Sequence, residues 1–416
     1  MIRSVISALF MGSACLQGAT PQTVDADYLA QLRGDASRQH PTTVAANLRT
    51  TAAGQDIGTV RLWDDPMAGL ALMAAPRMMR ADEGDVKMAI EQKLPKPGLY
   101  AAKLSKAEAM QRAEREKSRS SQLEVGAEAA RLAVELALAD DIISLQSEQI
   151  SWLDEMVRNA GQLSLDPAST SVDTLRLESE LARDSQTLES AKRTRESLAA
   201  RLNLIIGRDP DASWPRLTLP ATPPPVPVAH AEIARIPHAN PLVRSLREMT
   251  AAVGAETRIA DRARQPEVSV GVESAIYSGG DYRSTMVGVK VSLPWFNDRS
   301  YQAAVDASKT REEAAALDVE SVRLQIADKV LSAATDAANA AAQARAYSGE
   351  ILEKTRLASE SLEASWISSK SPLTDLFESR RLLFSVRLES RRFIAMEFAA
   401  LEELNLLVPA SNSFQK

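Results

Sequence analysis

The sequence contains little cysteine, histidine, glycine or aromatic residue, and these shortages exclude several kinds of protein. Its single cysteine, Cys15, lies near the N-terminus, so the rest of the chain has no disulfide framework, thiolate metal site or catalytic cysteine. The histidines His40, His230 and His238 are not at metal-ligand spacings. We find no glycine-rich phosphate loop and no nucleophile with a histidine base. The sequence therefore predicts a protein that is not an enzyme and that holds neither a cofactor nor a metal ion.

A strong charge of one sign and long apolar runs are also missing. The chain has 49 Lys and Arg against 55 Asp and Glu, a net charge of -6. It lacks the basic stripe that neutralises phosphates, so we predict no nucleic-acid partner. After the N-terminal segment there is no run of about 18 or more apolar residues, and we expect no transmembrane helix. If the chain spans a membrane, it does so with strands.

The first 19 residues are typical of an export signal. One arginine precedes a short apolar run at residues 5–11, and the small residues 12–14 precede Cys15. Cleavage before Cys15 would leave an N-terminal cysteine, the position that bacterial lipoproteins acylate. Gly12, however, stands where a lipobox normally has Leu or Val. Two outcomes stay open, a lipid anchor on Cys15 or a plain cleaved signal.

The second half of the chain repeats the first at an offset of about 200 residues. The repeat predicts two copies of one unit, residues 20–208 and residues 231–408. Residues 209–230 between them are rich in proline and are expected to form a stiff extended connector, and residues 409–416 form a tail. The matching segments are His40-Pro41 with Asn240-Pro241, Pro66 with Pro266, Lys93-Leu94-Pro95 with Ser292-Leu293-Pro294, Asp173 with Asp375, and Leu202-Asn203-Leu204 with Leu404-Asn405-Leu406.

Each copy contains a predicted pair of strands. From Glu267 to Glu273 apolar and polar residues alternate, with Val268, Val270 and Val272 on one face. We predict strands at about 266–275 and 286–294, with weaker copies at about 66–75 and 86–95. Each run is close to the ~9–11 residues of a tilted membrane strand, with an apolar face for lipid and a polar face for water. An ordinary hairpin on a soluble sheet would show the same alternation.

Long helices follow the strand pairs. Residues 99–162 contain no proline, and Leu136, Ile143, Ile150 and Val157 repeat at seven, which is typical of a coiled-coil seam. Residues 300–366 form the matching segment, and shorter helices precede each strand pair and follow each long helix. The predicted fold is therefore mainly α with a small β part, built from a duplicated unit of helix, strand, strand, long helix and helix.

Four strands are too few to close a barrel, and an open sheet edge in lipid leaves backbone groups unpaired at several kcal/mol each. A membrane-spanning form must then be an oligomer. Three chains would supply twelve strands, within the range of outer-membrane barrels, and their long helices would continue the tube. We predict a homotrimer.

With its duplication, its proline-led first strands and the Leu-Pro that closes each second strand, the chain resembles the TolC-type outer-membrane efflux proteins. Residues 291–299 are similar to the heavy-metal (CzcC and CusC type) branch. The resemblance implies a trimeric duct in the outer membrane of a Gram-negative bacterium, a 12-strand β-barrel continued into the periplasm by a 12-helix α-barrel. Its partners would be outer-membrane lipid, a periplasmic adaptor protein and an inner-membrane pump of the resistance-nodulation-division type.

Heavy-metal cations are the cargo that the resemblance implies, and the acidic balance of the chain is compatible with a cation path. A multidrug or type I secretion exit channel is the alternative within this class. A periplasmic coiled-coil scaffold without a pore is the alternative of another class, although it would have no use for two strand pairs.

The resemblance also assigns residues to the far end of the helices, where each long helix turns back. Asp375 and Glu378 match acidic rings at the closed entrance, Trp366 matches an aromatic that holds the entrance shut, and Asp173 matches the corresponding aspartate of the first copy. Capping of a helix N-terminus would equally explain the aspartates, and coiled-coil packing would explain Trp366. Ser369 and Pro167 stand where the family has glycines. The expected adaptor-contact tips are Ser369, Ser371, Pro372, Pro167 and Thr170.

Overall fold

A computed structural model describes residues 21–72, 85–163, 171–220, 236–277, 280, 282–368 and 370–408. The expected signal segment with Cys15 and the tail at 409–416 lie outside these residues. So do Pro167, Thr170 and Ser369 of the expected adaptor-contact tips.

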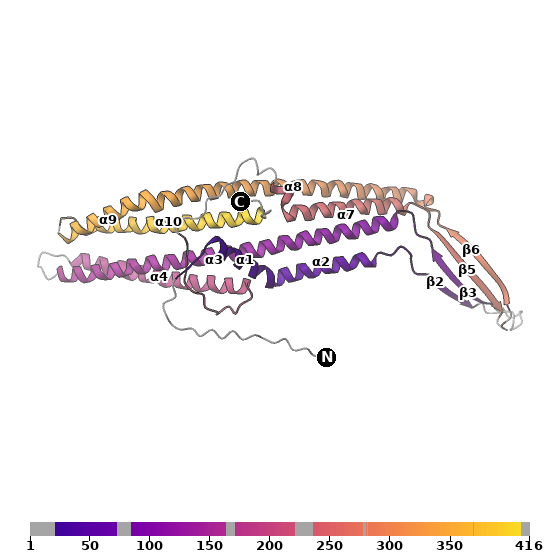
Figure 1. The fold of residues 1–416 in the computed structure, drawn as a ribbon, viewed down its shortest axis with the longest axis horizontal. Helices are drawn as coiled ribbons and strands as arrows, with labels where there is room; N and C mark the ends of the chain where they lie inside the picture. The colour runs from indigo at the N-terminus through magenta and orange to yellow at the C-terminus, as the bar shows by residue number, and fades with distance from the viewer. Residues whose placement is uncertain are drawn as a thin grey trace. The chain divides into compact units, whose positions relative to one another are not determined.

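The elements occur in the expected order twice (Figure 1). The first copy consists of α2 (Pro41–Thr59), β2 (Met67–Leu72), β3 (Asp85–Lys93), α3 (Leu99–Leu163) and α4 (Ser171–Ile205). The second consists of α7 (Pro241–Ala263), β5 (Val268–Tyr277), β6 (Tyr282–Val291), α8 (Asp298–Ala346), α9 (Leu352–Ile367) and α10 (Leu373–Leu407). Among the smaller elements are β1 (Gln22–Thr23), α1 (Ala26–Gln39), β4 (Leu217–Thr218), α6 (Ile236–Ala239) and a 3-10 turn (Pro294–Asn297).

The two long helices differ. In the first copy α3 runs for 65 residues without a break. In the second copy the π-helical turn Tyr347–Ile351 separates α8 from α9, and Gly349 within it has non-helical angles, φ -102° and ψ -110°. The single helix expected over 300–366 is therefore two helices joined by this turn, which glycine tolerates better than other residues.

The repeated His-Pro and Asn-Pro pairs begin equivalent helices. His40 caps α2 by accepting a hydrogen bond from the backbone N–H of Thr42 at 3.3 Å, and Asn240 caps α7 through Leu242 at 2.9 Å. The proline that follows each cap lacks an N–H and has a helix-compatible φ, so it suits the first helical position. This part of the sequence repeat therefore encodes two helix starts.

The chain divides into two compact units, and each unit takes residues from both sequence repeats. Unit 1 comprises Met1–Ser37, Val125–Pro227 and Ala333–Leu404, and unit 2 comprises Arg38–Glu124, Val228–Ser332 and Asn405–Lys416. The repeats of the sequence, 20–208 and 231–408, are thus not the compact bodies of the fold. The long helices α3 and α8 contribute residues to both units, because each runs across the boundary at Val125 or Ala333.

Unit 2 contains a four-stranded antiparallel sheet of order β2-β3-β5-β6. Figure 1 shows these strands side by side. The two copies meet at the β3–β5 pair, where Ile90 lies opposite Val272. Within the described residues β2 and β6 are the edge strands, since each pairs on one side only.

Unit 1 is helical and has two apolar clusters. The first lies on α1, α3, α4 and α10 and includes the fully buried Leu29, Leu132 and Leu202. The second, which we call the end cluster, joins residues of α3, α4 and α10, including Leu153, Leu177 and Leu376. A two-residue parallel bridge between β1 and β4 places part of the connector on the first cluster, where Leu217 and Leu219 are buried.

Among the described residues, the helices include none that is both long enough and apolar enough to cross a membrane.

Candidate functional site

One face of the unit 2 sheet is apolar and exposed. The strand register places the valines of β5 opposite those of β6, as their alternation predicts. Leu70 is 67% exposed and Val287 76% exposed, although buried positions are usual for such residues. We call this surface the apolar face. It consists of Ala68, Leu70, Leu72, Val86, Met88, Ile90, Val268, Val270, Val272, Val287, Val289 and Val291.

An exposed apolar surface that crosses four strands is rare on a soluble monomer and marks a surface that meets another apolar medium or protein. The free backbone groups of edge strands are likewise suited to pairing with another chain. The geometry of the sheet therefore fits contact with lipid on one face and with further strands at β2 and β6.

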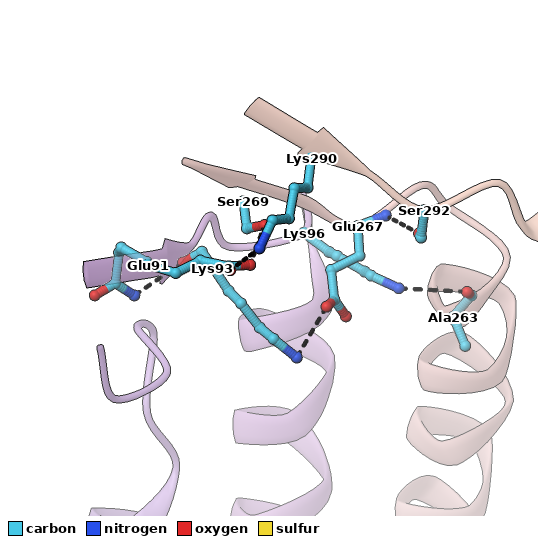
Figure 2. A network of polar contacts seen from close by, with 9 residues as sticks. Glu91, Lys93, Lys96, Ala263, Glu267, Ser269, Lys290 and Ser292 are labelled. Carbon is cyan, nitrogen blue, oxygen red and sulfur yellow. Dashed lines mark hydrogen bonds and ion pairs between the residues drawn. The ribbon is translucent and has the colours of Figure 1, made fainter. Parts of the chain in front are cut away.

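The opposite face carries charges in pairs. Lys87 Nζ lies 3.2 Å from Glu273 Oε1, and Lys93 Nζ lies 2.9 Å from Glu267 Oε1. Lys290 Nζ lies 2.5 Å from Glu91 Oε2. Figure 2 shows the last two pairs, of which the Lys290–Glu91 pair reaches across β5. We call this surface the polar face. Its charged residues fit contact with water.

Polar contacts fix the end of the sheet where the Leu-Pro motifs lie (Figure 2). The Ser292 hydroxyl accepts a hydrogen bond from the Glu267 N–H at 2.7 Å, and Leu94 N–H donates to Val268 O at 2.8 Å. Lys96 Nζ donates to the Ala263 carbonyl at 3.4 Å, which places a cation at the C-terminus of α7. The prolines after Leu94 and Leu293 have no N–H to extend the ladder, so both strands end there.

The second candidate surface is the turn between α9 and α10 in unit 1. Leu373 and Leu376 point into the end cluster, with exposed fractions of 4% and 0%. Asp375 and Glu378, one helical turn apart on α10, are exposed. The helical period thus brings the two predicted carboxylates to the surface next to a buried leucine pair.

Trp366, on α9, is half-buried and packs against the end cluster, so its packing role is present in this structure. Asp375 lies in the first turn of α10, where its charge complements the helix dipole. Its carboxylate accepts a hydrogen bond from the Thr374 hydroxyl at 3.4 Å. Asp173 lies in the first turn of α4, and its side chain is outside the described part of the structure.

Two of the expected adaptor-contact tip residues, Ser371 and Pro372, are among the described residues. Ser371 is half-buried, and its hydroxyl donates to the Leu362 carbonyl at 3.5 Å. Pro372 is exposed directly before α10. Of these two residues, Pro372 is exposed, whereas the Ser371 hydroxyl is engaged in closing the turn.

Trp152, in the same region, was not predicted from the sequence. Its indole N–H donates to Glu363 Oε1 at 3.3 Å, and its ring meets Phe377 edge-on at 6.4 Å between centroids. The Arg380 guanidinium lies 4.7 Å from the ring centroid, and burial lowers the pKa of Arg380. The signal was present, because Trp152 lies two residues after Ile150 of the predicted helix seam.

Two adjacent aspartates of α3, also missed, hold the connector. Asp140 accepts hydrogen bonds from Arg195 Nε at 2.9 Å and from the Leu217 N–H at 3.0 Å. Asp141 accepts from the Thr218 hydroxyl at 3.0 Å and from the Leu219 N–H at 3.3 Å. Burial raises the pKa of Asp141 despite these bonds and the nearby Arg391. We call this arrangement the connector clasp.

Comparison with solved structures shows the same fold. The chain is similar to the outer membrane protein VceC of Vibrio cholerae (TM-score 0.77, 13% identity, covering 92% of this chain and 96% of VceC). It is similar to CusC, whose structures describe transmembrane channel formation (TM-score 0.80, 13% identity, covering 95% of this chain and 98% of CusC). It is also similar to the open state of the MtrE outer membrane channel of Neisseria gonorrhoeae (TM-score 0.76, 17% identity, covering 91% of this chain and 88% of MtrE).

Sequence comparison points the same way for the second copy. Residues 235–392 match the family model described as outer membrane efflux protein. No curated protein sequence matches the chain. The matched segment contains the β5–β6 strand pair, both parts of the second long helix and the turn that carries Asp375 and Glu378. The second copy therefore matches the outer membrane efflux protein family by sequence, and the chain shares the fold of the solved structures to which it is similar.

Proposed function

We propose that this chain is the passive exit duct of a tripartite efflux system in the outer membrane of a Gram-negative bacterium. The observation that carries the proposal is the exposed apolar face on a sheet whose two edge strands each pair on one side only. A soluble scaffold would gain nothing from such a sheet, and it would aggregate through its apolar face and its edges.

The proposed assembly is a homotrimer. Each chain contributes four strands, so three chains give a barrel of about twelve strands in which β6 of one chain pairs with β2 of the next. The apolar face then contacts lipid and the polar face lines the water-filled interior. The long helices of the three chains form the proposed periplasmic tube of twelve helices. Cys15 is the proposed lipid anchor.

The proposed entrance is the turn between the long helix and its return helix in each copy. Three copies of Asp375 and Glu378 would form two acidic rings one helical turn apart, with Asp173 in the equivalent place of the first copy. Trp366, packed on the end cluster, would hold α9 in its closed position. The adaptor would contact Ser369, Ser371, Pro372, Pro167 and Thr170, and through it the duct would join the inner-membrane pump.

Heavy-metal cations are the proposed cargo, on the similarity of residues 291–299 and the exposed carboxylates at the turn. Organic drugs are the second candidate cargo, since the lysines and glutamates of the polar face form ion pairs and leave a wall suited to an uncharged solute.

The assembly is tested with the detergent-extracted protein. Electron microscopy should show three-fold particles, and reconstitution into a planar lipid bilayer should give discrete single-channel conductance. Monomers that stay in solution without detergent and that give no conductance would refute the duct and favour a scaffold.

The cargo is tested in cells that lack this exit duct but retain its adaptor and pump. Restoring the chain should raise the tolerated concentration of divalent heavy-metal salts. A rise for organic drugs alone would replace the proposed cargo while keeping the duct. The double variant Asp375→Asn, Glu378→Gln serves as the matched variant, and it should leave expression unchanged but alter block of the channel by divalent cations.

A further inference from the structure

The Glu91–Lys290 pair differs from an ordinary surface ion pair because it spans three strands. Glu91 lies on β3 and Lys290 on β6, and β5 runs between them. Glu91 Oε2 reaches Lys290 Nζ at 2.5 Å, and its other oxygen accepts the Ser269 hydroxyl of β5 at 2.6 Å. Figure 2 shows the Lys290 and Ser269 side chains converging on Glu91.

A glycine makes this reach possible. Gly271 is the residue of β5 directly opposite Glu91. A Cβ at Gly271 would lie 3.1 Å from the Ile90 carbonyl oxygen and 3.6 Å from the Glu91 Cβ. The distance to the carbonyl oxygen is shorter than most Cβ contacts in proteins, so glycine fits best here. Because Gly271 has no side chain, nothing on β5 at this position blocks the Glu91 side chain, which lies across β5 toward Lys290.

The two partners are covered to different degrees. The Lys290 side chain is 76% exposed, whereas the Glu91 side chain is 21% exposed. Lys290 therefore stands between Glu91 and the water on the polar face. If Lys290 lost its charge, the Glu91 carboxylate would stay at the same level of the wall and would keep the hydrogen bond from the Ser269 hydroxyl.

We infer that Lys290 keeps the β-barrel from selecting cations over anions, because it cancels the charge of a ring of Glu91 carboxylates. The inference rests on the proposed function, in which the polar face lines the interior and three copies surround it. The other lysines of this face, Lys87 and Lys93, are paired in the same way, so the wall is electrically balanced at the described pairs. Selectivity of the assembled duct then comes from other levels of the pore, such as the acidic turn.

Fixed charge on a pore wall acts on passing ions over a Debye length, about 10 Å at 0.1 M salt and about 3 Å at 1 M. Three uncompensated carboxylates at one level should raise the local cation concentration. The permeability ratio of K⁺ to Cl⁻ in Lys290→Gln should therefore rise about twofold or more at 0.1 M salt, and the rise should shrink at 1 M. Glu91→Gln should shift the ratio in the opposite direction.

The experiment measures reversal potentials of single channels in a planar bilayer under a KCl gradient. The charge-swapped variant Glu91→Lys, Lys290→Glu and the neutral variant Glu91→Gln, Lys290→Gln are the matched controls, and both should return the wild-type ratio. A purely structural role of the pair would instead make the neutral variant as abnormal as the single variants. All four are also made in the Asp375→Asn, Glu378→Gln background, so that the acidic turn does not mask the barrel.

Opposite shifts for the two single variants, restored by the swap, support the inference. Channels whose ratio is the same in every variant and in both backgrounds would overturn it while leaving the duct intact. If Lys290→Gln fails to assemble, the Glu91→Gln shift toward anions still decides the question. Absence of any conductance from the wild-type protein would instead refute the proposed function itself.

Discussion

In unit 1 the side chains of Leu132, Leu202 and Leu376 are fully buried, whereas in unit 2 Leu70, Val287 and Phe296 are exposed by 67%, 76% and 78%. The two apolar clusters formed by the described residues both lie within unit 1. The contrast shows that unit 1 buries apolar side chains in clusters of its own. Unit 2 places much of its apolar surface on the outside of its sheet, so its stable environment has to be supplied by lipid or by other chains.

The contrast is sharpest on β6, where neighbouring residues lie on opposite faces. Val287 belongs to the apolar face and Met286 to the polar face, and both are exposed, by 76% and 62%. An arginine in the lipid-facing position costs about 2–4 kcal/mol near the middle of a bilayer, once for each chain of an oligomer. We expect Val287→Arg to abolish insertion into the outer membrane and Met286→Arg to leave it largely intact, measured as the protein recovered in the membrane fraction.

Equal recovery of the two variants would show that the apolar face does not meet lipid. Equal loss would show that any arginine on β6 prevents folding. In that case Val287→Ser and Met286→Ser, which carry no charge, should still differ in the same direction.

In unit 1, a cavity in the apolar core should lower the free energy of unfolding. Leu376→Ala removes a fully buried side chain from the end cluster and should cost about 2–5 kcal/mol. Leu382→Ala on the same helix changes a side chain that is 56% exposed and should lower stability far less. Hydrogen exchange of α10 amides in detergent distinguishes the two, with faster exchange expected for Leu376→Ala only. Matching exchange rates would contradict the burial of Leu376.

Local patterns in the sequence were enough to predict the element order and the two faces of the sheet. Alternation from Val268 to Val272 is a property of neighbouring residues, and the register of the strands confirms it. The break at Gly349 was not predicted, because the alanine-rich residues before it favour an uninterrupted helix. The return turn was located by resemblance, and the structure places Asp375 and Glu378 on its exposed side.

Contacts between distant residues could not be predicted. Glu91 and Lys290 are 199 positions apart, and their pairing requires both the β3–β5 register and the absence of a side chain at Gly271. The connector clasp joins Asp140 to Arg195 over 55 positions. Asp140 and Asp141 lie between Leu136 and Ile143 of the predicted helix seam. They were a usable local signal, since carboxylates in such places are normally paired.

Breaking the connector clasp should lower stability less than the cavity left by Leu376→Ala. Asp140→Ala removes the acceptor of the Leu217 N–H and of Arg195 Nε, while Arg195 keeps its hydrogen bond to the Trp214 carbonyl. The loss should cost about 2 kcal/mol. Glu128→Ala, also on α3, breaks an exposed pair with Arg131 and should cost about 0.5 kcal/mol or less. Limited proteolysis should cut the connector of Asp140→Ala faster than that of Glu128→Ala. Unchanged cleavage in both would show that Asp140 does not hold the connector.

The smallest expected effect is a pH dependence within the same clasp. The pKa of Asp141 is raised above its ordinary value of 3.8 because burial outweighs the attraction of Arg391 and the hydrogen bonds from Thr218 and Leu219. The folded state therefore binds this proton more tightly than the unfolded state does. Stability from this group is present at low pH and declines as pH rises from about 3.8 through the raised pKa. Asp141→Asn removes the ionisation and can still accept from the Leu219 N–H. Its unfolding midpoint, relative to that of the wild type, should rise as pH increases through this range. A constant difference between the two midpoints at every pH would show that Asp141 titrates alike in the folded and unfolded chains, and that its place in unit 1 is wetter than its burial indicates.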